Sequence, residues 1–400
     1  MSITVLKFGG SVLKDDAAII NAARIVKGFC DGSNRVIAVV SAQGGMTDSL
    51  TKEAKRLSEN PSKRELDVIM SAGELLSAAK LAIAVEGLGQ SSISLSGWQA
   101  GIMTNSVNGG ARIKDIDIKR VQKELDRKKA VIVAGFQGVN RHNDMTTLGR
   151  GGSDTTAVAL AAALGADKCI IYSTVDGIYT ADPEKVTDAI KLNEIDYNSM
   201  QELSFLGVKV LNPRAVELAR KYSVTLEVRS AFSENPGTVV KETAGVEKML
   251  ISGVTKKSSI ARITVSGLKG TSGEVFSVFG LMSQNNINCD IILQTTEKDG
   301  TTDIAFTVNE DDADNAAKIL KNSGQFDENA IECDKSAAKV SVVGAGMESH
   351  PGVAAAIYEA LSEKNIDVLM ISSSEMRFSV VVKKDDADAA VMAIHKRFYN

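Results

Sequence analysis

Three short glycine-rich segments in the first half of the chain carry residue types that can bind phosphate. They are KFGGS (7–11), SAQGGMTD (41–48) and GRGGSD (149–154). Backbone amides at glycines can approach an anion closely, and a neighbouring lysine such as Lys7 adds a positive charge. One glycine pair alone could equally form an ordinary turn beside a surface lysine. The P-loop pattern GxxxxGK[ST] is absent from the sequence.

The third segment adds groups suited to an amino acid. Arg150 offers a planar guanidinium that can bind one carboxylate through two hydrogen bonds. Gly151 and Gly152 expose amides at the start of an apolar helix pattern, whose dipole favours negative charge. Ser153 and Asp154 could simply cap that helix, although capping needs neither the arginine nor two glycines. We therefore expect a ligand site at this helix N-terminus.

Two further observations concern the chemistry. Glu74, in MSAGELLSAAK, is a candidate partner for a substrate ammonium group, and the alternative is an ordinary acid in the first turn of a helix. The chain has three histidines, none of them in a glycine-rich segment. A hydroxyl acceptor usually needs a general base, whereas a carboxylate acceptor is already ionised at neutral pH. The composition is thus compatible with a kinase that forms an acyl phosphate by alignment and charge neutralisation.

The elements that must position these segments alternate over the first 230 residues. Apolar runs predict strands at ITVLKFG, RVIAVVSA, SSISLSG, AVIVAGFQG, KCIIYST and VTLEVRS, and helical spacing marks 15–29 and 155–164. Continuous Val and Ile runs are typical of strands covered on both faces. We therefore expect an α/β fold with a mostly parallel sheet sandwiched by helices. The glycine-rich turns would meet at the carboxyl edge of that sheet, where such folds bind ligands.

The second half contains an internal repeat. Residues 231–248 are rich in Gly, Pro, Glu, Lys and Thr and predict a linker. Beyond it, NINCDII at 286 matches NIDVLMI at 365, an offset of 79 residues. The two DDAD blocks, at 311 and 385, are 74 residues apart, so the second copy loses five residues in its central hairpin. We expect domains at 1–230, 249–335 and 336–400.

Composition limits the class of protein. A chain of 400 residues exceeds one ordinary core, so two or three domains are expected. A net charge of −4 and a pI near 5.7 argue against nucleic-acid or membrane-surface binding. The four cysteines form no close pairs, which argues against disulfides and zinc sites and favours a reducing cytoplasm. We find no signal-type segment and no 18-residue apolar run.

Taken together and in this order, the segments resemble aspartate kinases of the amino-acid kinase superfamily. DGIYTADP (176–183) and KVLNPRAVE (209–217) belong to the same set, and the repeat, with VGAGMESHPGVAAAIYEAL, resembles tandem ACT domains. The resemblance covers nearly the whole chain. It implies an amino-acid kinase fold followed by two βαββαβ ferredoxin-like ACT units. It also implies ATP-dependent phosphorylation of the side-chain carboxylate of L-aspartate to 4-phospho-L-aspartate, which begins lysine, threonine and methionine biosynthesis.

The resemblance assigns roles to individual residues of the first 230. The positions expected to bind ATP are Lys7, Phe8, Gly9, Gly10, Ser11, Ser173, Thr174, Tyr179, Asp182, Glu184, Lys209 and Val210. The positions expected to bind aspartate are Ser41, Thr47, Glu74, Arg150, Gly151, Gly152, Ser153 and Asp154. Lys7 and Asp154 would be catalytic. Mg²⁺ would arrive with ATP, held largely by phosphates and water, and no protein metal site is expected.

The ACT resemblance implies feedback control. Effector contacts are expected at Asp290, Ile291, Gln294, His350, Gly352, Val353 and Ser373. Lysine is the first expected effector and threonine the next, and the alternative is that the repeats only dimerise. Pairing of ACT units implies a homodimer or larger assembly, because a single sheet leaves an edge to be covered.

Several positions depart from the family pattern. Ser173-Thr174 stands where Thr-Asp is usual and Glu184 where Arg is usual, which puts ATP affinity in doubt. Asn212 replaces the usual His. Ser272 replaces the usual Pro in the first ACT copy, which puts effector binding there in doubt.

Other functions remain open at this point. Another kinase of the superfamily, acting on glutamate, N-acetylglutamate or a nucleoside monophosphate, is opposed by Glu74 and by the ACT tail. A non-catalytic amino-acid sensor is supported only by the altered residues on the ATP side. Whether Met249 begins a separately translated regulatory chain is also open.

Overall fold

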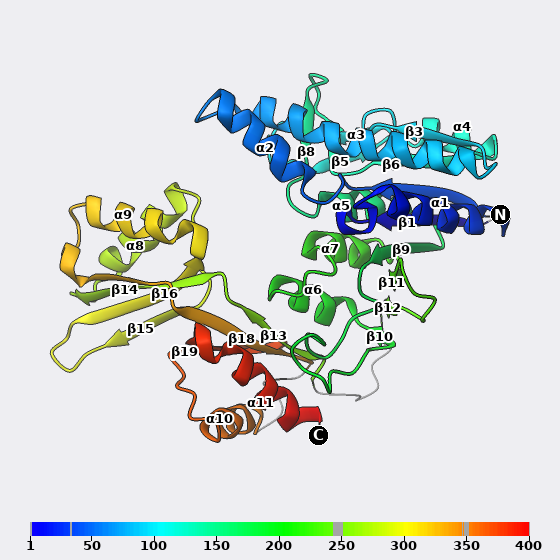
Figure 1. Cartoon of the computed structure of the whole chain (residues 1–400). Helices are drawn as coiled ribbons and strands as arrows, with labels where there is room; N and C mark the ends of the chain where they lie inside the picture. The colour runs from blue at the N-terminus through cyan, green and yellow to red at the C-terminus, as the bar shows by residue number, and fades with distance from the viewer. Residues whose placement is uncertain (1, 33, 243–250, 346, 348–351, 400) are drawn as a thin grey trace. The chain divides into compact units, whose positions relative to one another are not determined.

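The computed structural model describes residues 2–32, 34–242, 251–345, 347 and 352–399. These residues form two compact units, and each is described by itself. The first unit comprises Met1–Ile178 and Lys191–Gly245, and the second comprises Tyr179–Ile190 and Val246–Asn400. Figure 1 shows the strands and helices of each unit. His350, Met249 and residues 243–248 of the predicted linker lie outside the described residues.

The first unit is built on an eight-stranded sheet. In spatial order its strands are β10 (Glu194–Ile195), β12 (Thr238–Val240), β11 (Leu226–Ser230), β9 (Lys168–Ser173), β1 (Ile3–Phe8), β2 (Arg35–Val40), β6 (Ala130–Ala134) and β3 (Ser92–Leu95). Neighbouring strands are parallel except for the β11–β12 pair. All six strands expected from the sequence lie in this sheet, which confirms the predicted α/β fold. β12 falls within the stretch predicted as linker.

Helices cover both faces of this sheet. On one face, α1 (Asp16–Asp31) and α3 (Lys63–Gly87) share a buried core with Leu6 and Phe8 of β1. On the other face, α5 (Gly152–Leu164) packs across β1, β2 and β9. Because side chains alternate along a strand, Leu6 and Phe8 point toward α1 while Lys7 points toward α5. The sheet thus delivers one lysine to the helix that begins in the GRGGSD segment.

A smaller sheet precedes α5 in the chain. Its strands are β5 (Ile113–Ile116), β4 (Ile102–Thr104), β7 (Gln137–Val139) and β8 (Met145–Thr147). The sequence pattern does not indicate these four strands as separate elements, because runs of three or four residues carry little periodicity. β8 ends at Thr147 and leads directly into the Leu148–Gly152 segment. This small sheet therefore determines where that segment starts.

The helix α3 determines the surroundings of Glu74. Among the described residues it is the one helix long and apolar enough, by length and composition, to cross a membrane. It is not an uninterrupted apolar run, because it contains Glu74 and Lys80. Its buried positions include Asp67, Ser71 and Glu74 as well as apolar residues. Ser62 caps its N-terminus by accepting a hydrogen bond from the Glu65 amide at 3.3 Å. Glu74 therefore lies in the middle of a helix, and the first-turn alternative for this residue is wrong.

The second unit contains the two copies of the repeat, each with a four-stranded antiparallel sheet. The first sheet has the order β15 (Ile292–Thr296), β16 (Thr302–Asn309), β14 (Ile260–Leu268), β17 (Ile331–Asp334), with helices α8 (Ser272–Gln284) and α9 (Ala313–Asn322). The second has the order β13 (Gly253–Lys257), β18 (Ala337–Val343), β20 (Arg377–Lys383), β19 (Met370–Ser374), with α10 (Val353–Ser362) and α11 (Ala387–Tyr399). The predicted ferredoxin-like repeat is confirmed.

The two copies share one backbone detail and differ in two others. Asn286 and Asn365, at the start of the matched segments, both have positive φ, 56° and 53°. The hairpin turn spans 297–301 in the first copy and 375–376 in the second, which accounts for much of the shortening. The outer strand β13 precedes the first copy in the chain but pairs with β18 of the second. The predicted boundary at 249–335 had placed this strand in the first copy.

The segment Tyr179–Ile190 belongs to the second unit, although both of its flanks belong to the first. Ala181 and Val186 are buried in the core of the second repeat copy. The Thr180 hydroxyl lies 2.8 Å from Nε2 of His395 on α11, and the Thr180 carbonyl accepts the Val254 amide at 2.7 Å. This stretch is therefore anchored on the repeat and not on the large sheet.

Candidate active site

An ion pair lies at the carboxyl edge of the large sheet. Lys7, next to the last residue of β1, places its Nζ 2.6 Å from Oδ1 of Asp154 in the first turn of α5. Both side chains are nearly buried, with 12% and 9% exposed. In such surroundings the attraction between two opposite charges is stronger than at the surface. The structure thus brings together the two residues predicted to be catalytic.

The first two glycine-rich segments pack against each other beside this pair. The Gly44 amide donates to the Gly10 carbonyl at 3.0 Å, and the Ser41 amide donates to the Phe8 carbonyl at 3.0 Å. A Cβ on Gly10 would lie 2.5 Å from the Ala42 carbonyl, so only glycine fits there. The predicted meeting of these turns at one sheet edge is observed for these two segments. Phe8 itself is fully buried and stacks on Tyr172, with ring centroids 5.1 Å apart.

The third segment begins α5 without a side-chain cap. Gly151 is the N-cap residue and has φ 72°. Ser153 and Asp154 lie inside the first turn, so the capping alternative for them is wrong. The Gly152 amide donates to the Gly149 carbonyl at 2.9 Å and the Asp154 amide to the Gly151 carbonyl at 3.1 Å. These two amides are therefore used within the turn, whereas the sequence predicted an exposed amide at Gly152.

Asn212 holds this segment in place. Its side-chain Nδ2 donates to the Arg150 carbonyl at 3.0 Å, and its backbone amide donates to Oδ2 of Asp154 at 3.2 Å. Asn212 is also the N-cap of α7 (Pro213–Lys221), where it accepts the Arg214 amide at 3.0 Å. A Cβ on Gly151 would lie 2.2 Å from Asn212 Nδ2. Asn212, which departs from the family pattern, thus binds both Arg150 and Asp154. Both residues belong to GRGGSD (149–154), which we call the arginine segment.

Glu74 is a buried carboxyl group with one free oxygen. It is 3% exposed, and its Oε1 accepts the Ala42 amide at 3.1 Å. Oε2 has no hydrogen-bond partner among the described residues. Burial raises the pKa of Glu74 to about 7, and the hydrogen bond from Ala42 opposes this shift. A buried acceptor without a partner is costly, so this oxygen is suited to a ligand that donates a hydrogen bond.

The other predicted substrate positions lie beside the same turns. Ser41 follows β2 directly and is half-buried. Thr47 is in the first turn of α2 (Met46–Leu57), whose N-cap Gly45 has φ 80°. Gln43, between them, donates to the Leu13 carbonyl at 3.0 Å and accepts from Lys80 of α3 at 2.9 Å. The second segment is therefore tied both to the first segment and to α3.

The predicted nucleotide positions divide between the two units. In the first unit, Ser173 ends β9, Thr174 is exposed, and Lys209 and Val210 lie between α6 (Tyr197–Phe205) and α7. Tyr179, Asp182 and Glu184 belong to the second unit. There the side chain of Asp182 accepts the Glu184 amide at 3.0 Å. These positions stay predictions. Among the described residues we find no cluster of three or more His, Cys, Asp or Glu side chains that could hold a metal ion.

The predicted effector positions have different surroundings. Asp290 forms ion pairs with Lys339 and, at 3.7 Å, with Arg377 of the second copy. Ile291 is buried in a small cluster with Ala337 and Met370 of the second copy. The remaining described positions are Gln294 and Ser373, both exposed, Gly352, the N-cap of α10, and Val353, which is buried. Asp290 and Ile291 thus join the two copies within one chain.

Sequence reasoning missed three residues that hold the site together: Asp67, Lys80 and Arg214. Arg214 donates to the Leu148 carbonyl at 3.1 Å, just before the arginine segment. Arg214 stood inside a quoted motif, but nothing in its spacing indicated this bond. Asp67 carried a signal, because it lies seven residues before Glu74 and so on the same face of a helix.

Comparison with known proteins places the chain in a family. Residues 2–230 match the amino acid kinase family, and residues 263–323 and 340–398 match an ACT domain. The aspartokinase of Bacillus sp. (strain MGA3) is 44% identical over 400 residues, covering 100% of this chain and 97% of the relative. The chain therefore belongs to the amino acid kinase family and, within it, to the aspartokinases. The enzyme class predicted from the sequence is confirmed.

Solved structures agree with this assignment. The crystal structure of E. coli aspartokinase III in complex with aspartate and ADP has a TM-score of 0.81 at 24% identity, with 100% of both chains covered. The structure of the same enzyme in complex with lysine and aspartate has a TM-score of 0.76 at 25% identity, again with full coverage. The predicted combination of an α/β kinase fold with ACT units is thereby confirmed.

Proposed function

We propose that this protein transfers the γ-phosphoryl group of ATP to the side-chain carboxylate of L-aspartate and releases 4-phospho-L-aspartate and ADP. The observation that carries the proposal is the Lys7–Asp154 pair, 2.6 Å apart, beside two interlocked glycine turns in a chain of the aspartokinase family. A positive group held at the end of a strand can neutralise charge on the transferring phosphoryl group. Asp154 keeps the Lys7 ammonium in position for that task.

Two groups would hold the amino acid. Arg150 is exposed and its backbone is fixed by Asn212, so its guanidinium is free to bind the α-carboxylate through two hydrogen bonds. The free Oε2 of Glu74 would accept from the α-ammonium group. With both α groups held, the side-chain carboxylate is left to face ATP. Ser41, Thr47, Gly151, Gly152 and Ser153 complete the proposed substrate positions.

The nucleotide would lie over the first glycine turn. Gly9, Gly10 and Ser11 are proposed to contact its phosphates through the backbone, and Phe8 contributes only backbone atoms because its ring is buried. Mg²⁺ would come with ATP and neutralise part of the phosphate charge. The donor set fits this arrangement, because the nearby carboxylate of Asp154 is already paired with Lys7. Ser173, Thr174, Tyr179, Asp182, Glu184, Lys209 and Val210 remain the proposed nucleotide contacts.

The ACT units are proposed to sense an end product of the pathway. Lysine is the first candidate, in keeping with the lysine complex of the E. coli relative, and threonine is the second. We place effector contacts at Asp290, Ile291, Gln294, His350, Gly352, Val353 and Ser373, and we propose a homodimer or larger assembly through the ACT sheets. The proposed location is the cytoplasm, where Mg-ATP is available and four unpaired cysteines stay reduced.

Trapping the acyl phosphate tests the reaction. Incubation with Mg-ATP, L-aspartate and hydroxylamine should yield aspartyl hydroxamate, and glutamate or N-acetylglutamate in place of aspartate should yield little product. Lys7→Ala should lower the rate by roughly 10²-fold or more, as loss of one transition-state charge does. The matched control is Lys14→Ala, which removes an exposed lysine seven residues further along the chain. Absence of hydroxamate together with no heat of ATP binding would favour a non-catalytic sensor instead.

A further inference from the structure

One face of α3 carries three buried polar residues in a row. Asp67, Ser71 and Glu74 follow each other at spacings of four and three, so they lie on one side of the helix. Glu74 contacts the second glycine segment through the Ala42 amide, and the Ser71 carbonyl accepts Nε2 of Gln137 at 2.9 Å. Asp67 lies about 10 Å before Glu74 along the axis, at 1.5 Å per residue. The helix thus presents an ordered series of polar contacts to the site.

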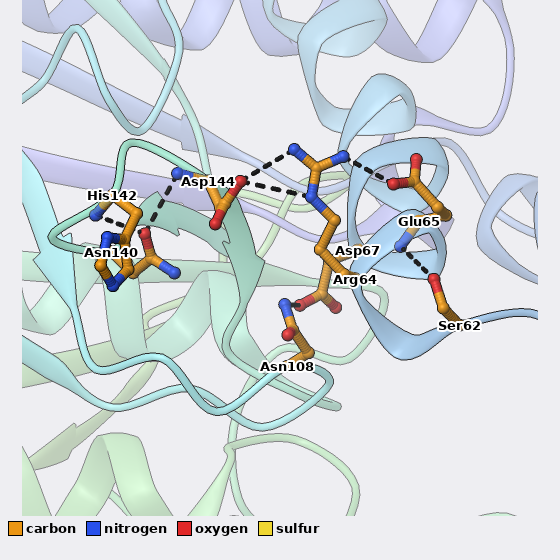
Figure 2. Close-up of polar contacts among 8 residues, drawn as sticks. All are labelled: Ser62, Arg64, Glu65, Asp67, Asn108, Asn140, His142 and Asp144. Atoms are coloured by element: carbon orange, nitrogen blue, oxygen red, sulfur yellow. Dashed lines mark hydrogen bonds and ion pairs between the residues drawn. The ribbon is translucent and has the colours of Figure 1, made fainter.

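Asp67 is a fully buried carboxylate, and donors from the loop after β4 and from the end of β8 surround it. Figure 2 shows it beside Asn108, whose Nδ2 donates to Oδ2 at 2.8 Å. The Gly109 amide donates to both carboxylate oxygens, at 3.1 and 3.0 Å. The Thr147 hydroxyl donates to Oδ1 at 2.5 Å. These bonds satisfy the buried charge and join residues some 40 and 80 positions away along the chain.

Both donor segments reach the arginine segment, one through the chain and the other through contacts. Thr147 is the last residue of β8, and Leu148, Gly149 and Arg150 follow it directly. The Thr147 carbonyl accepts the Ala111 amide at 2.8 Å, which ties the two donor segments to each other. A Cβ on Gly149, with φ 79°, would lie 3.3 Å from the Gly109 carbonyl, so the chain also comes into contact at that point. The Asp67 carboxylate therefore fixes Thr147, Arg214 holds the carbonyl of Leu148, and Asn212 holds the carbonyl of Arg150.

We propose that Asp67 is a positioning residue that holds Arg150 at the correct spacing from Glu74 for an amino-acid substrate. One rigid helix then carries both the carboxylate that meets the α-ammonium and the carboxylate that places the arginine for the α-carboxylate. The inference rests on the proposed function of Arg150 and Glu74. Asp67 itself touches no reacting group.

The same end of α3 provides a matched control. Figure 2 shows Arg64 beside Asp144, with its Nη2 2.8 Å from Oδ1, at the tip of the hairpin between β7 and β8. This contact also joins α3 to the small sheet. Asp144 directly precedes Met145, the first residue of β8. The contact therefore lies at the opposite end of this strand from Thr147 and the arginine segment. Both partners are at least one-third exposed.

The experiment measures the KM of each substrate in the full-length enzyme. Asp67→Asn keeps the shape of the side chain but replaces one acceptor oxygen by a donor. We expect it to raise the KM of aspartate at least tenfold and to change the KM of ATP less than twofold. Thr147→Val removes a single donor to Asp67. It should raise the KM of aspartate about threefold and leave the KM of ATP unchanged, and it tests the proposal if Asp67→Asn does not fold. Arg64→Ala and Asp144→Asn should leave both constants within twofold of wild type.

Results from the single variants and from the double variant can overturn the inference. One is an equal rise of the KM of aspartate and the KM of ATP in Asp67→Asn and Thr147→Val. A lower melting temperature of these variants with both KM values unchanged would count in the same way, because a purely structural residue behaves like this. The other comes from the double variant. If Asp67 acts through Arg150, adding Asp67→Asn to Arg150→Ala should raise the KM of aspartate no further, and a multiplied effect contradicts the proposal. Should Arg150→Ala alone leave that KM unchanged, the assigned role of Arg150 fails, and this inference fails with it.

Discussion

The proposed substrate positions and the proposed effector positions differ in how completely the surrounding protein fixes them. Around Arg150, the carbonyls of Leu148 and Arg150 are both held by side chains of the α7 region. In the ACT units, Gln294 and Ser373 lie on β15 and β19, the outermost strands of their sheets. All five residues of β15 are exposed. The substrate positions around Arg150 are held before a ligand arrives, whereas Gln294 and Ser373 of the effector set lie on edge strands.

This difference teaches what each site needs. A site that must orient a reacting carboxylate gains from groups that do not reorganise during the reaction. An edge strand presents unpaired backbone groups, so its surroundings are completed by another chain or by a ligand. We therefore expect substitutions in the first set to change substrate constants directly, and substitutions on the edge strands to change only the response to an effector.

The largest expected effect comes from Arg150→Ala. Loss of two charge-assisted hydrogen bonds to the α-carboxylate should raise the KM of aspartate roughly 100-fold or more, since such bonds contribute about 1.5–3 kcal/mol each. The KM of ATP should change far less. Steady-state kinetics with each substrate varied in turn measure both constants. Arg141→Ala, on the nearby hairpin, is the control, and equal effects on aspartate and ATP would show that the arginine has been misplaced.

Glu74→Gln should change the pH dependence. The pKa of Glu74 in the folded protein, about 7, lies above its ordinary value of 4.5, so the folded protein holds the proton to higher pH. Only the ionised form is a strong partner for ammonium, and the KM of aspartate in the wild type should therefore fall as pH rises through about 7. The variant should bind aspartate weakly with a flat pH profile between pH 6 and 8. A variant profile that keeps the wild-type slope would contradict the assignment.

Glu74→Gln should weaken aspartate binding but should stabilise the ligand-free protein at high pH. Because the raised pKa favours the neutral carboxyl, stability of the ligand-free wild type is lost as pH rises from about 4.5 to about 7. Glu74→Gln removes this loss, on the order of 3 kcal/mol at most. Thermal unfolding should therefore show the variant more stable than wild type at pH 8 and nearly equal to it at pH 4.5. A variant that is less stable at pH 8 would mean that the charged form is well accommodated.

The smallest effect is expected from Gln294→Ala on the exposed strand β15. Basal activity and both KM values should stay within twofold, because the residue lies outside the substrate positions. The concentration of lysine or threonine that gives half-maximal inhibition should rise severalfold. Thr295→Ala, its exposed neighbour on the same strand, is the control. A change in basal kinetics would remove the distinction between the two kinds of site.

The sequence was sufficient for the elements whose patterns are long and apolar. The six strands of the large sheet were found because buried parallel strands form continuous Val and Ile runs, as in β2 and β6. The small sheet was missed, since three-residue strands such as β4 and β8 exist through their pairing partners. The pairing of β13 (Gly253–Lys257) with β18 of the second copy could not be predicted from the sequence either, because pairing between strands so far apart in the chain is decided by the tertiary fold.

The candidate site was predicted in its residue types but not in its supports. Lys7, Arg150 and Asp154 stood in glycine-rich motifs, and their chemistry could be reasoned from side chains alone. The bond from Arg214 to the Leu148 carbonyl spans 66 residues, and the bonds of Asp67 reach two separate donor segments. Such contacts depend on loop conformations that periodicity does not encode. Asn212 was noticed only as an unusual residue, and its two bonds to the arginine segment became visible in three dimensions.

The location of Tyr179–Ile190 limits how this protein can be divided. Its backbone leaves the kinase unit, buries Ala181 and Val186 in the second ACT copy, and returns. A fragment that stops near residue 245 would keep the whole kinase motif yet leave those two side chains without the core that covers them. A fragment that starts there would lack the threonine opposite His395. Each fragment would therefore lose contacts that the full chain makes, so the kinase unit and the ACT units are joined by packing as well as by the peptide chain.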